Sequence, residues 1–423
     1  MKPLARALPC LLGLMVLAHS ASGRAEQAPV AAATGKASES FDDQARFLAG
    51  LPVAEGSPLA TLQQGKDWQE HAKALDADWA KLEQKRLRAM AEWRDSELEP
   101  RFDLTRNLYY VFGGPDLISV AVLYPDAPVY VLCGLELIGQ VPALSGLKRA
   151  ALDRAMDNLR RSIASTVRAS FFKTNDMAAD LSRTELKGVL PLLYLFLARS
   201  NATLLDVKLI EIDRTGAYQE LAAGAKPGAG VPGARLRFKR AGQEKEQEIF
   251  YLRQNVESTV LAKSPGFLAF LKRHGPANSF FKAASFILHN SKRFSRMREF
   301  VLENSLSILQ DDSGVPFNAL KDEWRYTLYG RYLRPLPPFQ RHLQEELVKA
   351  FATGPVKPLP FVTGYRRPGD ANLLLALPKA TAQARPQETP AAEPEIPPGP
   401  DSESLPSKSL DKAQADPGLA QPQ

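Results

Sequence analysis

The spacing of apolar residues along the chain predicts an alternation of helices and strands. Steps of four and three separate the apolar residues Trp68, Ala72, Leu75, Trp79 and Leu82, which is the period of one face of a helix. Residues 59–98 are therefore predicted to form a long amphipathic helix or a helical hairpin. Pro100 should end this element, because proline has no backbone N–H to donate.

The most regular pattern lies in residues 107–139. An apolar run at 107–112 is followed by a Gly-Gly-Pro-Asp turn, an apolar helix at 117–124 and a second apolar run at 129–132. This order predicts a β-α-β unit, in which the two strands are parallel. Because functional residues of such units follow the carboxyl ends of the strands, we expect Gly113, Gly114, Asp116 and Glu136 to gather at one edge of a sheet.

The remaining patterns predict an α/β fold, a mixed sheet of about six to eight strands with flanking helices. Helices are predicted at 145–172, 188–199, 260–272, 279–290, 294–304 and 339–351. Strands are predicted at 204–212, 234–239, 248–253, 305–309 and 324–329, with the second and third forming a hairpin. Residues 361–365 are predicted to be a last extended segment.

Both ends of the chain differ in composition from the middle. Residues 1–25 combine the basic Lys2 and Arg6, a short apolar run and small residues, which is the pattern of a secretory signal peptide. Residues 26–40 are predicted to be a flexible lead-in. Residues 378–423 hold ten prolines and no aromatic residue, so this acidic tail is predicted to be disordered. Residues 41–377 are predicted to form one domain of a periplasmic or secreted protein.

Charge and cysteine content narrow the choice of partners. The net charge is +7 although the tail is acidic, and a basic body fits an anionic envelope component; nucleic acid is disfavoured for an exported chain.

Loss of the leader removes Cys10, so Cys133 cannot form an intramolecular disulfide. No later segment has the roughly 18 apolar residues of a spanning helix. Oligomeric state is not predicted.

Adjacent acids after the predicted strand at 305–309 are the first candidates for chemistry. Asp311 and Asp312 can act as turn formers, as ligands of a hard cation or as a general base. His289 is the candidate acid/base partner, because it follows Lys282 and Ser285 at helical spacing in the helix predicted at 279–290. Common zinc, nucleophile-elbow and P-loop motifs are absent from the sequence, and no metal-ligand set is predicted.

Glu136 also suggests a bound cofactor. It lies about twenty positions after Gly113 and Gly114, the spacing at which nucleotide-binding folds place the acid that holds ribose hydroxyls. The arrangement resembles that of methyltransferases that bind S-adenosylmethionine, although the turn lacks the full GxGxxG pattern. A structural turn beside a buried, hydrogen-bonded Glu136 is the alternative.

Four segments together resemble a family of exported bacterial proteins of unassigned function. They are GGPD at 113–116, GLE at 134–136, FFKTNDM at 171–177 and QDDSGVP at 310–316. The resemblance extends from about Trp68 to Tyr365 and implies a bacterial origin and a single cooperative domain. It carries no activity and no catalytic residue.

Three functions follow as hypotheses. The first is an exported protein that binds an anionic or sugar-containing ligand, with Gly113, Gly114, Asp116, Asp311 and Lys282 as ligand-binding residues. The second is a hydrolase or transferase in which Asp312, Glu136 and His289 are catalytic. The third is methyl transfer with S-adenosylmethionine bound at Gly113 and Glu136; otherwise no cofactor is identified.

Overall fold

A computed structural model describes residues 38–169, 185–222, 224–225, 227–367 and 369–379. The chain divides into two units, residues 1–37 and 38–423, and every described residue belongs to the second. The predicted signal peptide, most of the lead-in, the FFKTNDM segment and nearly all of the tail therefore lie outside the described residues.

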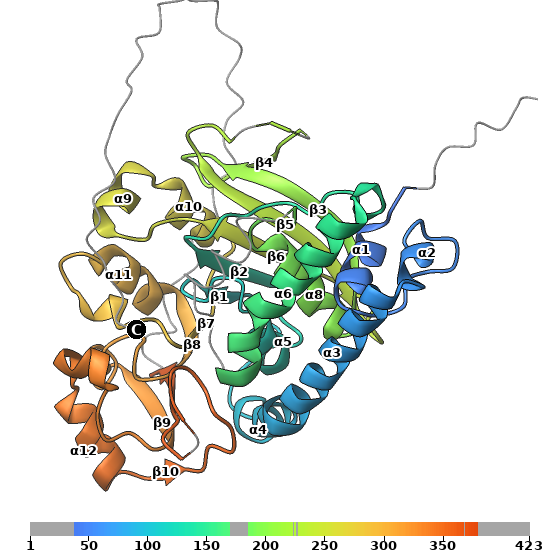
Figure 1. Ribbon diagram of the computed structural model, residues 1–423. Coiled ribbons are helices and arrows are strands. Elements are labelled where there is room, and N and C mark those ends of the chain that lie inside the picture. Colours follow the sequence, from blue (N-terminus) through green and yellow to red (C-terminus); the bar gives the residue numbers. More distant parts are fainter. Residues whose placement is uncertain (1–37, 170–184, 223, 226, 368, 380–423) are drawn as a thin grey trace, which may run out of the picture. The chain divides into compact units, whose positions relative to one another are not determined.

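An 11-stranded mixed sheet forms the centre of this unit (Figure 1). Its order is β10-β9-β11-β8-β7-β1-β2-β6-β5-β3-β4. The strands are β1 Leu108–Tyr110, β2 Val129–Gly134, β3 Ala202–Ile212, β4 Tyr218–Glu220, β5 Val231–Arg240, β6 Glu246–Arg253, β7 Ala277–Phe281, β8 Ser305–Gln310, β9 Trp324–Gly330, β10 Val356–Lys357 and β11 Asn372–Pro378. The predicted α/β fold is confirmed, and the sheet is larger than predicted.

Five neighbouring strands, in the order β8-β7-β1-β2-β6, are parallel. The helix α5, Leu117–Leu123, connects β1 to β2, which confirms the predicted β-α-β unit. Tyr109 pairs with Val131 of β2 on one side and with Ser279 of β7 on the other. The predicted hairpin is also present, because β5 and β6 pair antiparallel.

Helices cover both faces of the sheet, so its central strands are buried on both sides. One face carries α1 Phe41–Leu48, α2 Ala60–Gln63, α3 Lys66–Leu82, α4 Arg88–Trp93, α5, α6 Arg149–Ala169 and α8 Leu190–Arg199. The other carries α9 Ser258–Lys263, α10 Gly266–Arg273, α11 Ser295–Asn304 and α12 Glu345–Thr353. Adjacent residues of β1 alternate between the two cores: Tyr110 lies in the first and Tyr109 in the second. None of the described helices has both the length and the apolar character needed to cross a bilayer.

The helix predicted at 59–98 is largely continuous and forms no hairpin. After the short α2, helical structure extends from Lys66 to Leu98 through two π-helical turns, Glu83–Leu87 and Arg94–Leu98. The first turn carries Arg86, which is buried although it is charged. Such π turns occur often at functional sites.

The prediction of a helix at 279–290 is wrong. Residues Ala277–Phe281 form the central strand β7, and the only helical structure in 279–290 is the 3₁₀ turn Ile287–His289. All five residues of β7 are buried, the polar Asn278 and Ser279 included, as expected of a strand covered on both faces. A short run without alternating apolar and polar residues cannot be distinguished from a helix by its period. Lys282, Ser285 and His289 therefore share no helix face.

The carboxyl-terminal part also differs from the prediction. Residues 361–365 form no strand, and the last strand is β11, which lies antiparallel between β8 and β9. The helix predicted at 339–351 is divided into the 3₁₀ segment Pro337–His342 and α12. The helix predicted at 260–272 is divided into α9 and α10, with Pro265 between them. Short 3₁₀ turns also occur at Leu144–Gly146 and Phe317–Ala319.

Candidate functional site

The parallel strands bring most of the predicted site residues to one edge of the sheet. Gly113, Gly114 and Asp116 follow β1, Glu136 follows β2, Lys282 follows β7, and Asp311 and Asp312 follow β8. The chain continues from β1 to β2 on one side of β1 and later returns to β7 on its other side. The pair β1/β7 is thus a topological switch point, the place where open α/β sheets bind ligands.

A buried ion pair lies at this switch point. The ammonium of Lys282 is 2.6 Å from the carboxylate of Asp116, and their side chains are only 2% and 3% exposed. Lys282 also donates to the Ser119 hydroxyl at 2.8 Å, and the Tyr110 hydroxyl donates to Asp116 at 3.0 Å. Burial lowers the pKa of Lys282, whereas the charge of Asp116 raises it.

A second buried cation approaches the same carboxylate from the long helix. Burial lowers the pKa of Arg86 to about 10, and the negative charge of Asp116 acts against that shift. The positive charge of Arg86 in turn lowers the pKa of Lys282. Asp116 is therefore the counter-charge of two buried cations, from the loop after β7 and from the first π turn.

Asp311 ties the loop after β7 to the loop after β8. Its carboxylate accepts a hydrogen bond from the Ala283 N–H at 2.8 Å and another from the Ser313 N–H at 2.9 Å. The Ser313 hydroxyl also donates to it. Burial, together with the charge of Asp312, raises the pKa of Asp311 to about 6, so the carboxyl group is mostly ionised at neutral pH.

These hydrogen bonds hold a strained turn. Ala283, Ser285 and Phe286 have φ angles of 52°, 53° and 56°, in the left-handed region that costs non-glycine residues of order 1–3 kcal/mol each. The Ala284 N–H donates to the Ser313 hydroxyl at 2.7 Å, and the Tyr365 hydroxyl donates to the Ala283 carbonyl at 2.8 Å. Backbone strain of this kind clusters at ligand sites and switch regions.

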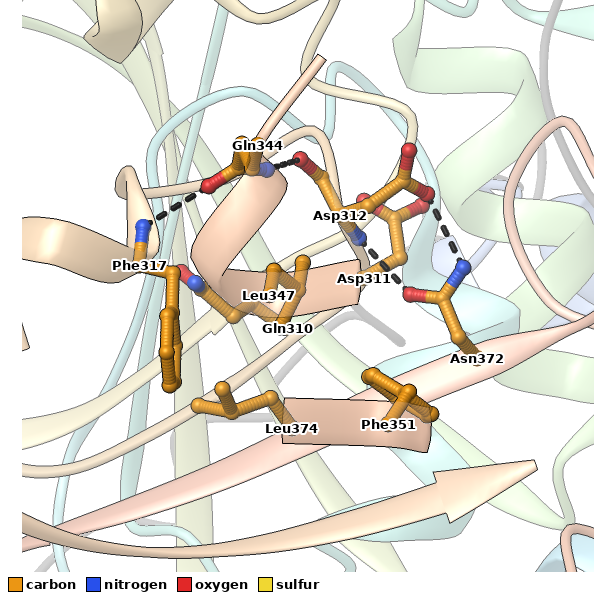
Figure 2. A pocket seen from close by; sticks show the side chains of 9 residues that line it. All are labelled: Gln310, Asp311, Asp312, Phe317, Gln344, Leu347, Phe351, Asn372 and Leu374. Carbon is orange, nitrogen blue, oxygen red and sulfur yellow. Dashed lines mark hydrogen bonds between the residues drawn. The ribbon is translucent and has the colours of Figure 1, made fainter. Parts of the chain in front are cut away.

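Asp312 is paired separately. Its carboxylate lies 2.7 Å from the Arg366 guanidinium and accepts from the Asn372 amide at 3.0 Å. Figure 2 shows the return hydrogen bond, from the Asp312 N–H to the Asn372 side chain, and the bond from Gln344 to the Asp312 carbonyl. The adjoining cavity, about 10 Å³ in volume, has room for one water molecule.

Glu136 lies on the β1–β2 side of the edge. One oxygen of its half-buried carboxylate accepts from the Tyr251 hydroxyl at 3.1 Å. No described group donates to its other oxygen, Oε1. A Cβ atom would lie 2.1 Å from the carboxylate if added to Gly134, and 3.3 Å from it if added to Gly114. The space for this carboxylate therefore depends on two glycines, one of which was predicted as a site residue.

His289 has different neighbours. Its ring contacts those of Phe286 and His342, with centroid distances of 5.1 and 5.6 Å, and burial lowers its pKa to about 4. Its Nε2 atom is buried and has no partner in the described part of the chain. Within that part, no hydrogen bond or ion pair joins His289 to Asp312 or Glu136, the other two residues predicted to be catalytic.

Sequence reasoning missed several residues of this edge. Arg86 follows Leu82 by one helical turn, so a charge on the apolar face of the long helix was a usable signal. Tyr110 and Ser119 lie within apolar runs, where nothing in the sequence marks them as site residues. Arg366 and Asn372 reach Asp312 across 54 and 60 positions of the chain, and local pattern gives no signal for such contacts.

Comparison with protein families, with curated proteins and with solved structures finds no match for this chain. In the described residues, no group of three or more His, Cys, Asp or Glu side chains is placed to hold a metal ion.

The ion pair at the switch point gives a first prediction. Asp116→Asn removes a buried counter-charge of Lys282 and Arg86, and breaking a buried pair costs about 3–5 kcal/mol. The double variant Asp116→Asn/Lys282→Met removes both partners and should lose less stability than Asp116→Asn alone. Urea unfolding followed by tryptophan fluorescence measures both losses. Equal or larger loss in the double variant would show that the two charges are not coupled.

Proposed function

We propose that this chain is an exported protein that binds a small, sugar-containing ligand at the carboxyl edge of its parallel strands. The observation that carries the proposal is the placement of Glu136 two residues after β2, beside Gly114 and Gly134. A carboxylate in this position accepts hydrogen bonds from neighbouring sugar hydroxyls.

The surroundings of Glu136 suit such a ligand. The Tyr251 hydroxyl orients one carboxylate oxygen, which leaves Oε1 to accept from the ligand. Leu135 and Leu137, on either side of Glu136, are 63% and 53% exposed. Small-molecule sites are lined mostly by apolar side chains around a few fixed polar groups, and these two leucines are accessible to a ligand. A sugar that also carries a phosphate would suit the net charge of +7.

The order of the strands supports ribose as the sugar. Numbered along the chain, the parallel strands β1, β2, β6, β7 and β8 lie in the order 3-2-1-4-5. Dinucleotide-binding folds have this order, and in them an acid near the end of the second strand holds the ribose hydroxyls. The helices between successive strands also lie on two faces here, as in those folds.

Methyl transfer with S-adenosylmethionine is a second candidate, favoured by one further observation. Antiparallel β11 lies between β8 and β9, and methyltransferases that use this cofactor also place an antiparallel strand next to their fifth parallel strand. Glu136 would hold the cofactor's ribose and Gly113 and Gly114 would pass close to it. One fold hosts many unrelated functions, so binding of this cofactor is decided by measurement. S-adenosylmethionine is a cytosolic metabolite, so export and this reaction exclude each other.

Export has a direct test. We expect the full chain, produced in a Gram-negative host, to be recovered from the periplasmic fraction or the medium, with a new amino terminus near residue 25. Leu12→Arg places a charge in the apolar run, so that variant should keep Met1 and stay in the cytosol. N-terminal sequencing of both fractions gives the answer. Wild-type chain retained in the cytosol with Met1 intact would contradict export.

Ligand binding is tested by thermal unfolding. The full chain should be stabilised by at least one of ribose, N-acetylglucosamine, adenosine and S-adenosylmethionine. A ligand at 100 times its Kd adds about 2.7 kcal/mol to the free energy of unfolding. Glu136→Gln should weaken that ligand tenfold or more, since an amide replaces an acceptor oxygen by a donor. Glu99→Gln, an exposed change on another part of the chain, should have no effect. Equal binding of the ligand by both variants would show that Glu136 is not part of the ligand site.

A further inference from the structure

A second cavity lies on the other side of the Asp311–Asp312 turn. It has a volume of about 10 Å³ and is bounded by three aromatic rings, two carboxylates and a guanidinium: Phe286, Phe339, Tyr365, Asp311, Asp312 and Arg366. The loops after β7 and β8, the 3₁₀ segment Pro337–His342 and the segment before β11 supply these residues. None of them contacts Glu136 in the described structure, so this cavity is separate from the proposed sugar site.

Its aromatic wall is continuous. The rings of Phe286 and Phe339 have centroids 5.0 Å apart, and those of Phe339 and Tyr365 lie 5.5 Å apart and nearly parallel. The face of an aromatic ring carries partial negative charge and attracts cations, most strongly where water is excluded.

The charged wall has an excess of negative charge. Among the described residues that line the cavity, Arg366 is the only cation, and it is shared between Asp312 at 2.7 Å and Asp370 at 3.1 Å. Asp311 accepts hydrogen bonds from N–H and O–H donors. The nearby ammonium of Lys282, whose pKa is raised by the charge of Asp311, is itself paired with Asp116. Arg334, Arg341 and Arg367 belong to the neighbouring segments but are exposed, where water and salt screen them. The cavity therefore disfavours an anion.

One segment can open the cavity. Within the described residues, every hydrogen bond of the 3₁₀ segment Pro337–His342 stays between residues 336 and 343. Ring contacts attach the segment to the rest of the molecule: Phe339 lies against Phe286 and Tyr365, and His342 lies against Phe286 and His289. Segments with so few anchoring contacts open at low cost, and outward movement of the half-buried Phe339 would enlarge the cavity toward solvent.

We propose that this cavity, once Phe339 has moved outward, binds an organic ammonium cation through the faces of Phe286, Phe339 and Tyr365 and the charge of Asp311. Aromatic rings beside a carboxylate form the environment in which quaternary ammonium groups are recognised. The site is independent of the sugar site, because Glu136 takes no part in it.

Calorimetric titration with choline tests the proposal. Choline should bind the wild-type chain. The alcohol 3,3-dimethyl-1-butanol, which has the same shape without the charge, should bind at least tenfold more weakly. Phe339→Leu should weaken choline tenfold or more while keeping the fold, because Phe339 is half-buried. Phe294→Leu changes another half-buried phenylalanine outside the cavity and should leave choline binding unchanged.

Glu136→Gln separates the two sites, since it should alter the response to sugars and leave choline binding unchanged. Absence of choline binding at millimolar concentration, equal affinity for the neutral alcohol, or unchanged affinity in Phe339→Leu would each overturn the proposal.

Discussion

The carboxyl edge of this sheet depends on one buried carboxylate. Asp311 accepts hydrogen bonds from the loop after β7 and from the loop after β8, and it thereby holds three left-handed residues that would otherwise relax. Lys282 comes immediately before this strained turn, and Phe286 is its last residue. The same carboxylate therefore sets the position of the buried ion pair and of the aromatic wall.

The ion pair at the switch point divides the edge into two halves. On the β1–β2 side, Glu136 lies where glycines leave it space; on the β7–β8 side, two carboxylates lie beside aromatic rings. Asp116 and Lys282 join the halves across β1 and β7. A buried ion pair contributes little net stability, because desolvation offsets its attraction. Its effect here is to fix how the two halves meet.

Local pattern accounts for what the sequence could predict. The β-α-β unit was predictable because its strands, turn and helix follow one another within one short segment, residues 107–139. Each of these parts has its own pattern of apolar residues. The strand β7 was not, because five buried residues in succession carry no period that separates strand from helix. The strand β11 was missed because its antiparallel partners β8 and β9 lie far along the chain.

The same limit applies to the site. Asp116, Glu136, Asp311 and Asp312 could be named as candidates because polar residues follow apolar runs at the ends of strands. Lys282 was named from its spacing in a predicted helix that the structure replaces by β7. The partners of Asp312 could not, since Arg366 and Asn372 belong to a segment more than 50 positions away. The left-handed turn at 283–286 also had no signal, because it contains no glycine or asparagine.

Amide hydrogen exchange at Ala283, Ala284 and Ser313 tests the central claim most directly. If the Asp311 carboxylate holds the strained turn, these amides are protected in the wild type and exchange much faster in Asp311→Asn, whereas amides of the β5–β6 hairpin keep their protection. Unchanged protection of the three amides in a folded Asp311→Asn protein would contradict the account.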